Sequence, residues 1–155
     1  MLKNKILSFI LFFIVTFSAS FVGGLVSINL KEPWYSTLIK SNFNPPDWVF
    51  APVWTILYLM MTFAIWNFWH SKNRDMNTVY IYFIHIIINT TWSIVFFALH
   101  KIFLAMLVLI TLIMFIVLLI IRFKPVNLLS YYLMMPYLLW CSYALFLNIN
   151  LVILN

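Results

Sequence analysis

Five long apolar runs, separated by short polar connections, constrain this chain more than any other feature of its sequence. Each run has about 20 residues or more, which is the length that a helix needs to cross the hydrocarbon core of a bilayer. Lipid does not tolerate open sheet edges, and the runs lack the alternating pattern of barrel strands, so helices are expected. The sequence therefore predicts an all-α integral membrane protein in which residues 1–155 form one five-transmembrane-helix bundle, with helices at about 6–30, 48–69, 76–99, 102–122 and 127–152.

The composition supports this prediction and excludes one class of partner. The chain is 66% hydrophobic and only 8% charged, whereas about a quarter of the residues in a soluble domain are charged. The net charge of +6 could suggest a nucleic-acid partner. However, the lysines and arginines lie singly or in near pairs between the apolar runs, as they do in the loops of membrane proteins. We therefore expect membrane lipid, and no nucleic acid, around this chain.

The connections between the runs predict an orientation. The first residues, MLKNKILSFILFFIVTFSAS, resemble a cleavable signal peptide, but the apolar run continues to Leu30, and we expect it to remain as the first helix. With five spans, the N-terminus and the second and fourth loops share one side of the membrane. That side holds twice as many basic residues (Lys3, Lys5, Lys72, Arg74, Arg122 and Lys124) as the other (Lys31, Lys40 and Lys101). In a bacterial cell membrane, which we expect for this protein, the positive-inside rule then predicts a cytoplasmic N-terminus.

The segment SNFNPPDWVFAPVWTILY, at 41–58, leads into the second span. Pro45 and Pro46 fix φ and favour extended geometry in the residues before them. The first loop is therefore expected to approach the membrane as an extended chain. Asp47 follows the prolines, and we expect its carboxylate to cap the new helix by accepting the free amide protons of the first turn.

Pro52 complicates the start of this helix. In a regular helix from Trp48 its ring would collide with the Trp48 carbonyl, so either the first turn is irregular or the regular helix begins near Ala51. In both cases a stiff segment presents Trp48, Phe50 and Trp54. An aromatic belt at the membrane surface is one interpretation of these residues. Because a belt anchor needs no rigid backbone and a pocket wall does, we favour a pocket wall for the two tryptophans.

Two further spans each carry polar and aromatic side chains along one helical stripe: His85, Asn89, Trp92 and Phe96 in the third span, and Pro136, Trp140, Tyr143 and Leu147 in the fifth. Polar groups at membrane depth face the bundle interior or a cavity, and aromatic walls can stack on a flat ligand. Plain helix–helix packing explains the same spacing, so spacing alone leaves both interpretations open. A lone histidine in a span is more often a hydrogen-bonding group than an iron ligand, and we predict no metal site.

Small residues in the first span recur at steps of four: Ala19, Gly23 and Ser27. Such a stripe allows another helix to approach closely. It forms either a dimer face or a seam within the chain, and the sequence does not choose between them.

Catalytic motifs are missing from the sequence. It has no Gly-rich phosphate loop, no Ser/His/Asp arrangement and no Cys/His cluster, which are the patterns that hydrolysis, phosphoryl transfer or metal chemistry would need. Its acidic residues, Glu32, Asp47 and Asp75, lie in loops or at the edges of spans. We therefore predict no catalytic residue.

Three ordered motifs resemble those of the translocator protein family, also called TspO or tryptophan-rich sensory proteins and historically the peripheral-type benzodiazepine receptors. The motifs are WYSTLIKSNFNPPDWVFAPVWTILYLMM at 34–61, NTTWSIVFF at 89–97 and PYLLWCSYALFLN at 136–148. The resemblance extends over nearly the whole chain. It implies a five-helix bundle, commonly a homodimer, that binds porphyrins such as protoporphyrin IX and haem, sterols and synthetic aromatic ligands in a pocket, with the first loop, 31–47, as its lid.

By motif position, the resemblance implies pocket residues on three helices, with porphyrin or haem as the ligand and no required cofactor. They are Trp48, Phe50, Ala51 and Trp54 from the second helix, Asn89 and Trp92 from the third, and Trp140, Tyr143, Ala144 and Leu147 from the fifth. The chain departs from the family pattern at His85, where many members have Gln. It also departs in LNINLVILN, at 147–155, which lacks the Tyr and the basic residue of the sterol-recognition pattern.

These observations lead to one main hypothesis and two alternatives. The main hypothesis is a membrane receptor or carrier for tetrapyrroles with a sensory, regulatory or transport role, in which Asn89 supplies a polar contact. Lys31 and Lys40 either meet the porphyrin propionates or are solvated loop charges. The first alternative, which the resemblance implies for some family members, is an enzyme that degrades bound porphyrin with light and oxygen, using pocket tryptophans as redox partners. The second is a lipid or sterol carrier, which the missing sterol pattern disfavours.

Overall fold

The computed structural model describes residues 4–155. Five helices in this part of the chain are long and apolar enough to cross a membrane, and the described residues include no strand, which confirms the predicted all-α five-span architecture. A short helix, α2 (Trp34–Thr37), lies in the first loop. The spans are α1 (Lys5–Leu30), the 3-10 turn η1 (Asp47–Val49) with α3 (Phe50–Trp69), α4 (Met76–Ser93) with the π-helical segment η2 (Ile94–Ala98), α5 (Ile102–Phe123) and α6 (Leu128–Leu154).

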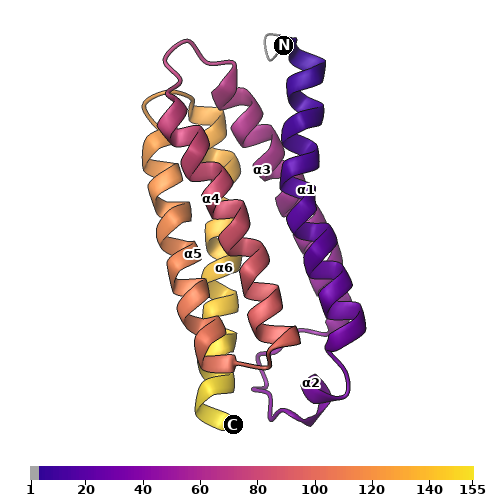
Figure 1. The fold of residues 1–155 in the computed structure, drawn as a ribbon. Helices are drawn as coiled ribbons and strands as arrows, with labels where there is room; N and C mark the ends of the chain where they lie inside the picture. Colours follow the sequence, from indigo (N-terminus) through magenta and orange to yellow (C-terminus); the bar gives the residue numbers. More distant parts are fainter. Residues whose placement is uncertain (1–3) are drawn as a thin grey trace.

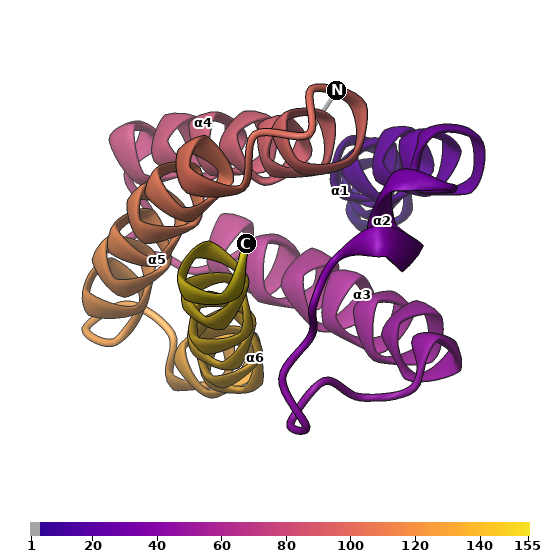
Figure 2. The same cartoon turned by 90° about the horizontal axis from the view of Figure 1, so that it is seen from below.

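The five spans form a ring around the bundle axis. Viewed along that axis they follow the order α1, α3, α6, α5 and α4 (Figure 2), and each neighbouring pair in this order packs together, including α4 with α1. The first loop with α2, the α4–α5 turn and the end of α6 lie at one end of the bundle. The start of α1 and the α3–α4 and α5–α6 connections lie at the other end (Figure 1). Which end faces the cytoplasm stays a prediction, and Lys3, one of the basic residues behind it, lies outside the described residues.

Polar side chains begin three of the spans by accepting free amide protons of the first turn, which is a common helix start signal. The Asn4 Oδ1 atom accepts from the amides two and three residues further on, at 2.9 and 3.2 Å. Asp75 caps α4 and Asn127 caps α6, each through the amide three residues further on. Asn127 also donates to Ser71 Oγ at 2.9 Å, and this bond joins two connections at the same end of the bundle.

The second span does not begin with the predicted Asp47 cap. Asp47 is the first residue of η1, and its carboxylate accepts a hydrogen bond from the Lys31 ammonium at the end of α1. The predicted cap is therefore wrong, because the carboxylate pairs with this cation instead of with the amides of the first turn. Pro52 is the third residue of α3, where an amide proton would have no partner within the helix. The 3-10 turn η1 is the irregular first turn that Pro52 led us to expect.

Large side chains fill the half of the bundle near the α3–α4 connection. Phe12, Phe68 and Phe123 are each at most 1% exposed, and the ring centroids of Phe68 and Phe123 are 4.9 Å apart. In the other half, α1 carries its small residues, including Gly23 and Gly24. Side chains on this part of α1 are too small to fill the space inside the ring, and a cavity opens there.

Candidate ligand-binding cavity

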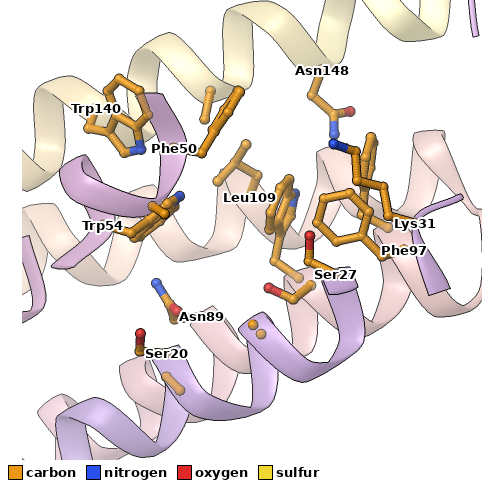
Figure 3. Close-up of a pocket in the computed structure, with 18 of the residues that line it drawn as sticks. Ser20, Ser27, Lys31, Phe50, Trp54, Asn89, Phe97, Leu109, Trp140 and Asn148 are labelled. Atoms are coloured by element: carbon orange, nitrogen blue, oxygen red, sulfur yellow. The ribbon is translucent and has the colours of Figure 1, made fainter. Parts of the chain in front are cut away.

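A cavity of about 360 Å³ lies between all five spans, in the half of the bundle next to the first loop (Figure 3). This volume is within the range of about 300–1,000 Å³ that is usual for ligand pockets. Small residues of α1 form one wall, aromatic residues of α3, α4, η2 and α6 form most of the others, and α5 contributes leucines. The small, aromatic and leucine residues that line the cavity include Ser20, Gly23, Gly24, Ser27, Phe50, Trp54, Tyr58, Trp92, Phe96, Phe97, Trp140, Leu109 and Leu112.

Most of the predicted pocket residues meet at this cavity: Phe50, Ala51, Trp54, Asn89, Trp92, Trp140, Ala144 and Leu147. Rings from different helices contact one another around it. The centroids of Phe50 on α3 and Trp140 on α6 are 6.0 Å apart, and those of Trp54 and Tyr137 are 6.2 Å apart. Packing and cavity lining therefore occur together on the third and fifth spans: side chains from these stripes pack against other helices and also line a void.

The structure places two of the predicted residues, Trp48 and Tyr143, outside this cavity. Trp48 lies in η1, before the regular helix begins, and its side chain is 74% exposed. Tyr143 follows Trp140 by three residues, which turns it about 60° to one side of Trp140 on the α6 surface, away from Ala144. Its hydroxyl donates to the Phe43 carbonyl at 2.6 Å, and the residue lines an apolar groove between α3 and α6. Tyr143 thus holds the first loop.

Asn89 lies where the cavity meets a buried polar network. The Tyr58 hydroxyl donates to Asn89 Oδ1 at 2.8 Å, and Asn89 Nδ2 donates to the Tyr137 oxygen at 2.6 Å. The Tyr137 oxygen therefore directs its own proton to His85 Nε2, 3.1 Å away, and His85 Nδ1 donates to the Tyr82 carbonyl at 3.3 Å. His85 is fully buried and acts as a hydrogen-bonding group between helices. Both polar atoms of Asn89 already have protein partners.

The cavity walls also contain buried polar atoms that the protein does not satisfy. Trp92 Nε1, Trp140 Nε1 and both amide atoms of Asn148 have no hydrogen-bond partner among residues 4–155, and all three residues line the cavity. Such atoms are rare in folded proteins. His, Cys, Asp and Glu side chains of the described chain form no group of three that could hold a metal ion.

Several parts of the cavity wall were not among the predicted pocket residues, including Tyr58, Phe97 and the α5 leucines. Two other unpredicted parts carried a signal in the sequence. One is the small-residue stripe of α1: a methyl group added at Gly23 would lie 2.9 Å from Ser93 Oγ of α4. At this position the stripe is a seam within the chain, and the same residues border the void. The stripe was visible in the sequence, but its spacing does not show what it packs against. The other is Asn148. The sequence signal for this residue was its polarity at membrane depth, one helical turn after Ala144.

Several contacts hold the first loop, residues 31–47, over one end of the cavity. Asn155 accepts from the Ile39 amide at 2.9 Å and donates to the Ile39 carbonyl at 3.0 Å. The ion pair of Lys31 with Asp47 joins the two ends of the loop. Tyr35 of α2 is buried, and burial raises the pKa of its phenol above the ordinary value. The loop is thus attached to α6 and closed on itself.

Comparison with known proteins identifies the family of this chain. The sequence profile of the TspO/MBR family matches residues 10–154. The chain is 32% identical to the tryptophan-rich protein TspO of Chlorobaculum tepidum, with 99% of each chain covered. It is 28% identical to protein CrtK of Rhodobacter capsulatus, covering 95% of this chain and 92% of the relative. It is 30% identical to the tryptophan-rich sensory protein of Cereibacter sphaeroides, covering 80% of this chain and 78% of the relative. Because the family profile spans nearly the whole chain, this multi-pass membrane protein belongs to the TspO/MBR family.

Proposed function

We propose that this protein is a membrane receptor or carrier that binds a tetrapyrrole, such as protoporphyrin IX or haem, in the cavity, with a sensory, regulatory or transport role. The observation that carries the proposal is the convergence of Trp54, Trp92 and Trp140, from three different helices, on one void. Membership of the TspO/MBR family supports it. One relative is itself named a tryptophan-rich sensory protein.

The walls of the cavity suit a flat macrocycle. Indole and phenyl faces stack on aromatic ligands, and each favourable ring pair adds roughly 0.5–1.5 kcal/mol beyond the burial of apolar surface. Gly24 on the opposite wall carries no side chain and has open space beside it, so a planar ligand can lie directly against the α1 backbone there. A site with aromatic faces on one side and bare backbone on the other favours ligands that are wide and thin.

The hydrogen bonds available to such a ligand differ from those in the sequence hypothesis. Asn89 was expected to supply a polar contact, and Tyr58 and Tyr137 already use one lone pair of its oxygen and one N–H of its nitrogen. The indole N–H groups of Trp92 and Trp140 are unpartnered among the described residues and can donate to ligand oxygens or nitrogens. We therefore assign the polar contacts on the aromatic walls to these two indoles.

The two lysines of the first loop are also engaged. Lys31 pairs with Asp47, and the Lys40 ammonium lies 4.0 Å from the centre of the Tyr35 ring, an attractive cation–π arrangement. A porphyrin propionate would have to compete with these contacts. In our proposal the first loop is a lid, and its opening breaks the bonds that hold it to α6 and lets the ligand pass.

Titration of the detergent-purified protein with protoporphyrin IX, followed by tryptophan fluorescence quenching, tests this proposal. Two variants change the cavity in opposite ways: Trp140→Ala removes a stacking wall, and Ala144→Phe fills part of the void. We expect each to weaken porphyrin binding by about tenfold or more. Trp140→Ala removes one ring contact and its buried area, and Ala144→Phe takes up space that the macrocycle needs.

Trp48→Phe is the matched control, since it removes a tryptophan that is exposed and outside the cavity. We expect it to bind porphyrin as the wild type does. If both cavity variants bound porphyrin with wild-type affinity, or if Trp48→Phe were as damaging as they are, the cavity would not be the porphyrin site.

A further inference from the structure

We propose that the end of the bundle opposite the first loop binds the headgroups of anionic phospholipids. The proposal concerns four cations, Lys72, Arg74, Arg122 and Lys124, which we call the basic face. The first two lie in the α3–α4 connection, Arg122 lies in the last turn of α5, and Lys124 begins the α5–α6 connection. Both connections lie at the end of the bundle away from α2 (Figure 1). The proposal therefore concerns a different part of the molecule from the cavity and does not depend on the proposed function.

Two polar contacts bring the two connections together. Asn127 donates to Ser71 Oγ at 2.9 Å, and Arg122 Nη1 lies 3.8 Å from Asp75 Oδ1. Each contact joins a residue at the α3–α4 connection to a residue at the α5–α6 connection. The cations of the basic face are either one of these four residues or lie between them in the chain. They therefore form one surface, although the two halves of it are about 50 residues apart in the sequence.

The positive charge of the basic face is largely unpaired. Asp75 is the one acidic side chain at this end of the described chain, and it contacts Arg122 through a single nitrogen of the guanidinium group. Lys72, Arg74 and Lys124 have no carboxylate partner among residues 4–155, and all three are exposed. A phosphate group can therefore bind to these cations without displacing a carboxylate of the protein.

Aromatic rings hold two of the cations in place. The Arg74 guanidinium carbon lies 4.7 Å from the centre of the Trp69 ring, and the Lys124 ammonium lies 5.7 Å from the centre of the Tyr131 ring. Such cation–π contacts attract the charge to the ring but supply no hydrogen-bond acceptor such as a carboxylate. The N–H groups of these cations remain available, and the planar fork of a guanidinium group matches the geometry of a phosphate.

Apolar side chains next to the basic face indicate that the anion is a lipid headgroup. Ile121, which precedes Arg122, is 62% exposed, and Leu128 and Leu129 at the start of α6 are also exposed. All three belong to helices that are long and apolar enough to cross a membrane. A phospholipid can therefore place its phosphate on the cations and its acyl chains along these side chains. A soluble phosphate would use the cations alone.

The test compares two lipids that share their acyl chains, dioleoylphosphatidylglycerol and dioleoylphosphatidylcholine. The full chain in detergent is equilibrated with an equimolar mixture of both and captured, and the retained lipids are quantified. Each cation near an anionic lipid surface contributes about fivefold in binding. Because Arg74 and Lys124 are both unpaired, we expect the wild type to retain the anionic lipid over the zwitterionic one by about twentyfold or more.

Two double variants of equal net charge locate the effect. Arg74→Gln with Lys124→Gln should reduce the preference to about threefold or less. Lys40→Gln with Lys101→Gln is the matched control, because it removes the same charge at the end of the bundle that carries the first loop, and it should keep the wild-type preference.

Other outcomes would overturn the proposal. Equal retention of the two lipids by the wild type would remove the lipid site. A control variant that lost as much preference as the basic-face variant would show general attraction by net charge instead of binding at the basic face. Displacement of the anionic lipid by excess inorganic phosphate, at constant ionic strength, would show a site for soluble anions. Should a variant not fold, the preference of the wild type and its response to phosphate still decide.

Discussion

Deletion of the Tyr137 hydroxyl tests whether the hydrogen bonds around Asn89 and His85, next to the cavity, stabilise the bundle. Tyr137→Phe keeps the ring and removes one oxygen, which accepts a hydrogen bond from Asn89 and directs its proton to His85. The two neighbours are not equivalent after this change. Asn89 borders the cavity, so water in the cavity can satisfy its amide. His85 is fully buried, so its Nε2 atom would lose its partner without gaining another.

The expected effect follows from the number of groups left unpaired. A buried neutral group without its partner costs about 1–3 kcal/mol in proteins. Hydrogen bonds between helices in a membrane protein are worth less, on average about 0.6 and at most about 1.7 kcal/mol, since the unfolded chain in the membrane also finds partners. We therefore expect Tyr137→Phe to lower the free energy of unfolding by about 1–2 kcal/mol. Tyr58→Phe, which frees only Asn89 Oδ1 at the cavity edge, should lower it by about 0.5 kcal/mol.

Unfolding in detergent micelles with increasing dodecyl sulfate, followed by circular dichroism, measures these differences. Tyr132→Phe is the control, because Tyr132 lies on the same helix, α6, and is 63% exposed; its effect should be within a few tenths of a kcal/mol. The reasoning would be refuted if Tyr137→Phe were no more destabilising than Tyr132→Phe. It would also be refuted if Tyr58→Phe had the larger effect, because the network would then not depend on the Tyr137 hydroxyl.

Three further predictions concern other parts of the bundle. Asp75→Ala removes the cap of α4 and should lower the unfolding free energy by about 1 kcal/mol, whereas Asp75→Asn should have less effect; equal losses would point to charge instead of capping. Burial, helped by nearby cations, lowers the pKa of His70 below its ordinary value of 6.5. The unfolded state then binds more protons in acid, so thermal stability should fall as the pH decreases through 6.5; His70→Gln should weaken this dependence, and an unchanged profile would contradict it. Gly24→Ala should be neutral or slightly stabilising, since a methyl group there meets nothing within 4 Å, but Gly23→Ala should be the less stable of the two because its methyl group would crowd Ser93. Thermal melts of the two variants compare them directly, and the reverse order would show that α1 and α4 are not in close contact.

The helices and most of the cavity residues were predictable because they depend on short stretches of sequence. A charge-free run such as that around Leu57 is long enough to span a bilayer wherever it occurs. Trp140, Ala144 and Leu147 share one side of their helix because of helical geometry alone. Family resemblance then indicated which side faces the cavity. The placement of Trp48 failed because it lies in a 3-10 turn, where the side-chain directions of the following α-helix do not apply.

Other features depend on contacts between distant parts of the chain. The acid at position 47 had the right type and position for a helix cap, and only the arrival of Lys31 from the preceding helix shows why it does not act as one. Tyr143 looks like a cavity residue by its spacing, but it contacts the backbone of Phe43, 100 residues away in sequence. Asn89 and Asn148 are both polar residues within spans, and nothing local distinguishes the amide that is bonded from the one that is free.

By itself the sequence determined that this protein is a five-helix membrane bundle, because an uninterrupted apolar segment in lipid must satisfy its backbone hydrogen bonds internally and a helix does so within a single run. The tertiary structure decided how each helix is rotated about its own axis against its neighbours, and thereby which aromatic side chains surround a void and which polar groups find partners. Periodicity relates side chains along one helix only. The space between helices depends on the sizes of side chains from all of them together, and here small residues of α1 opposite the tryptophans leave that space open.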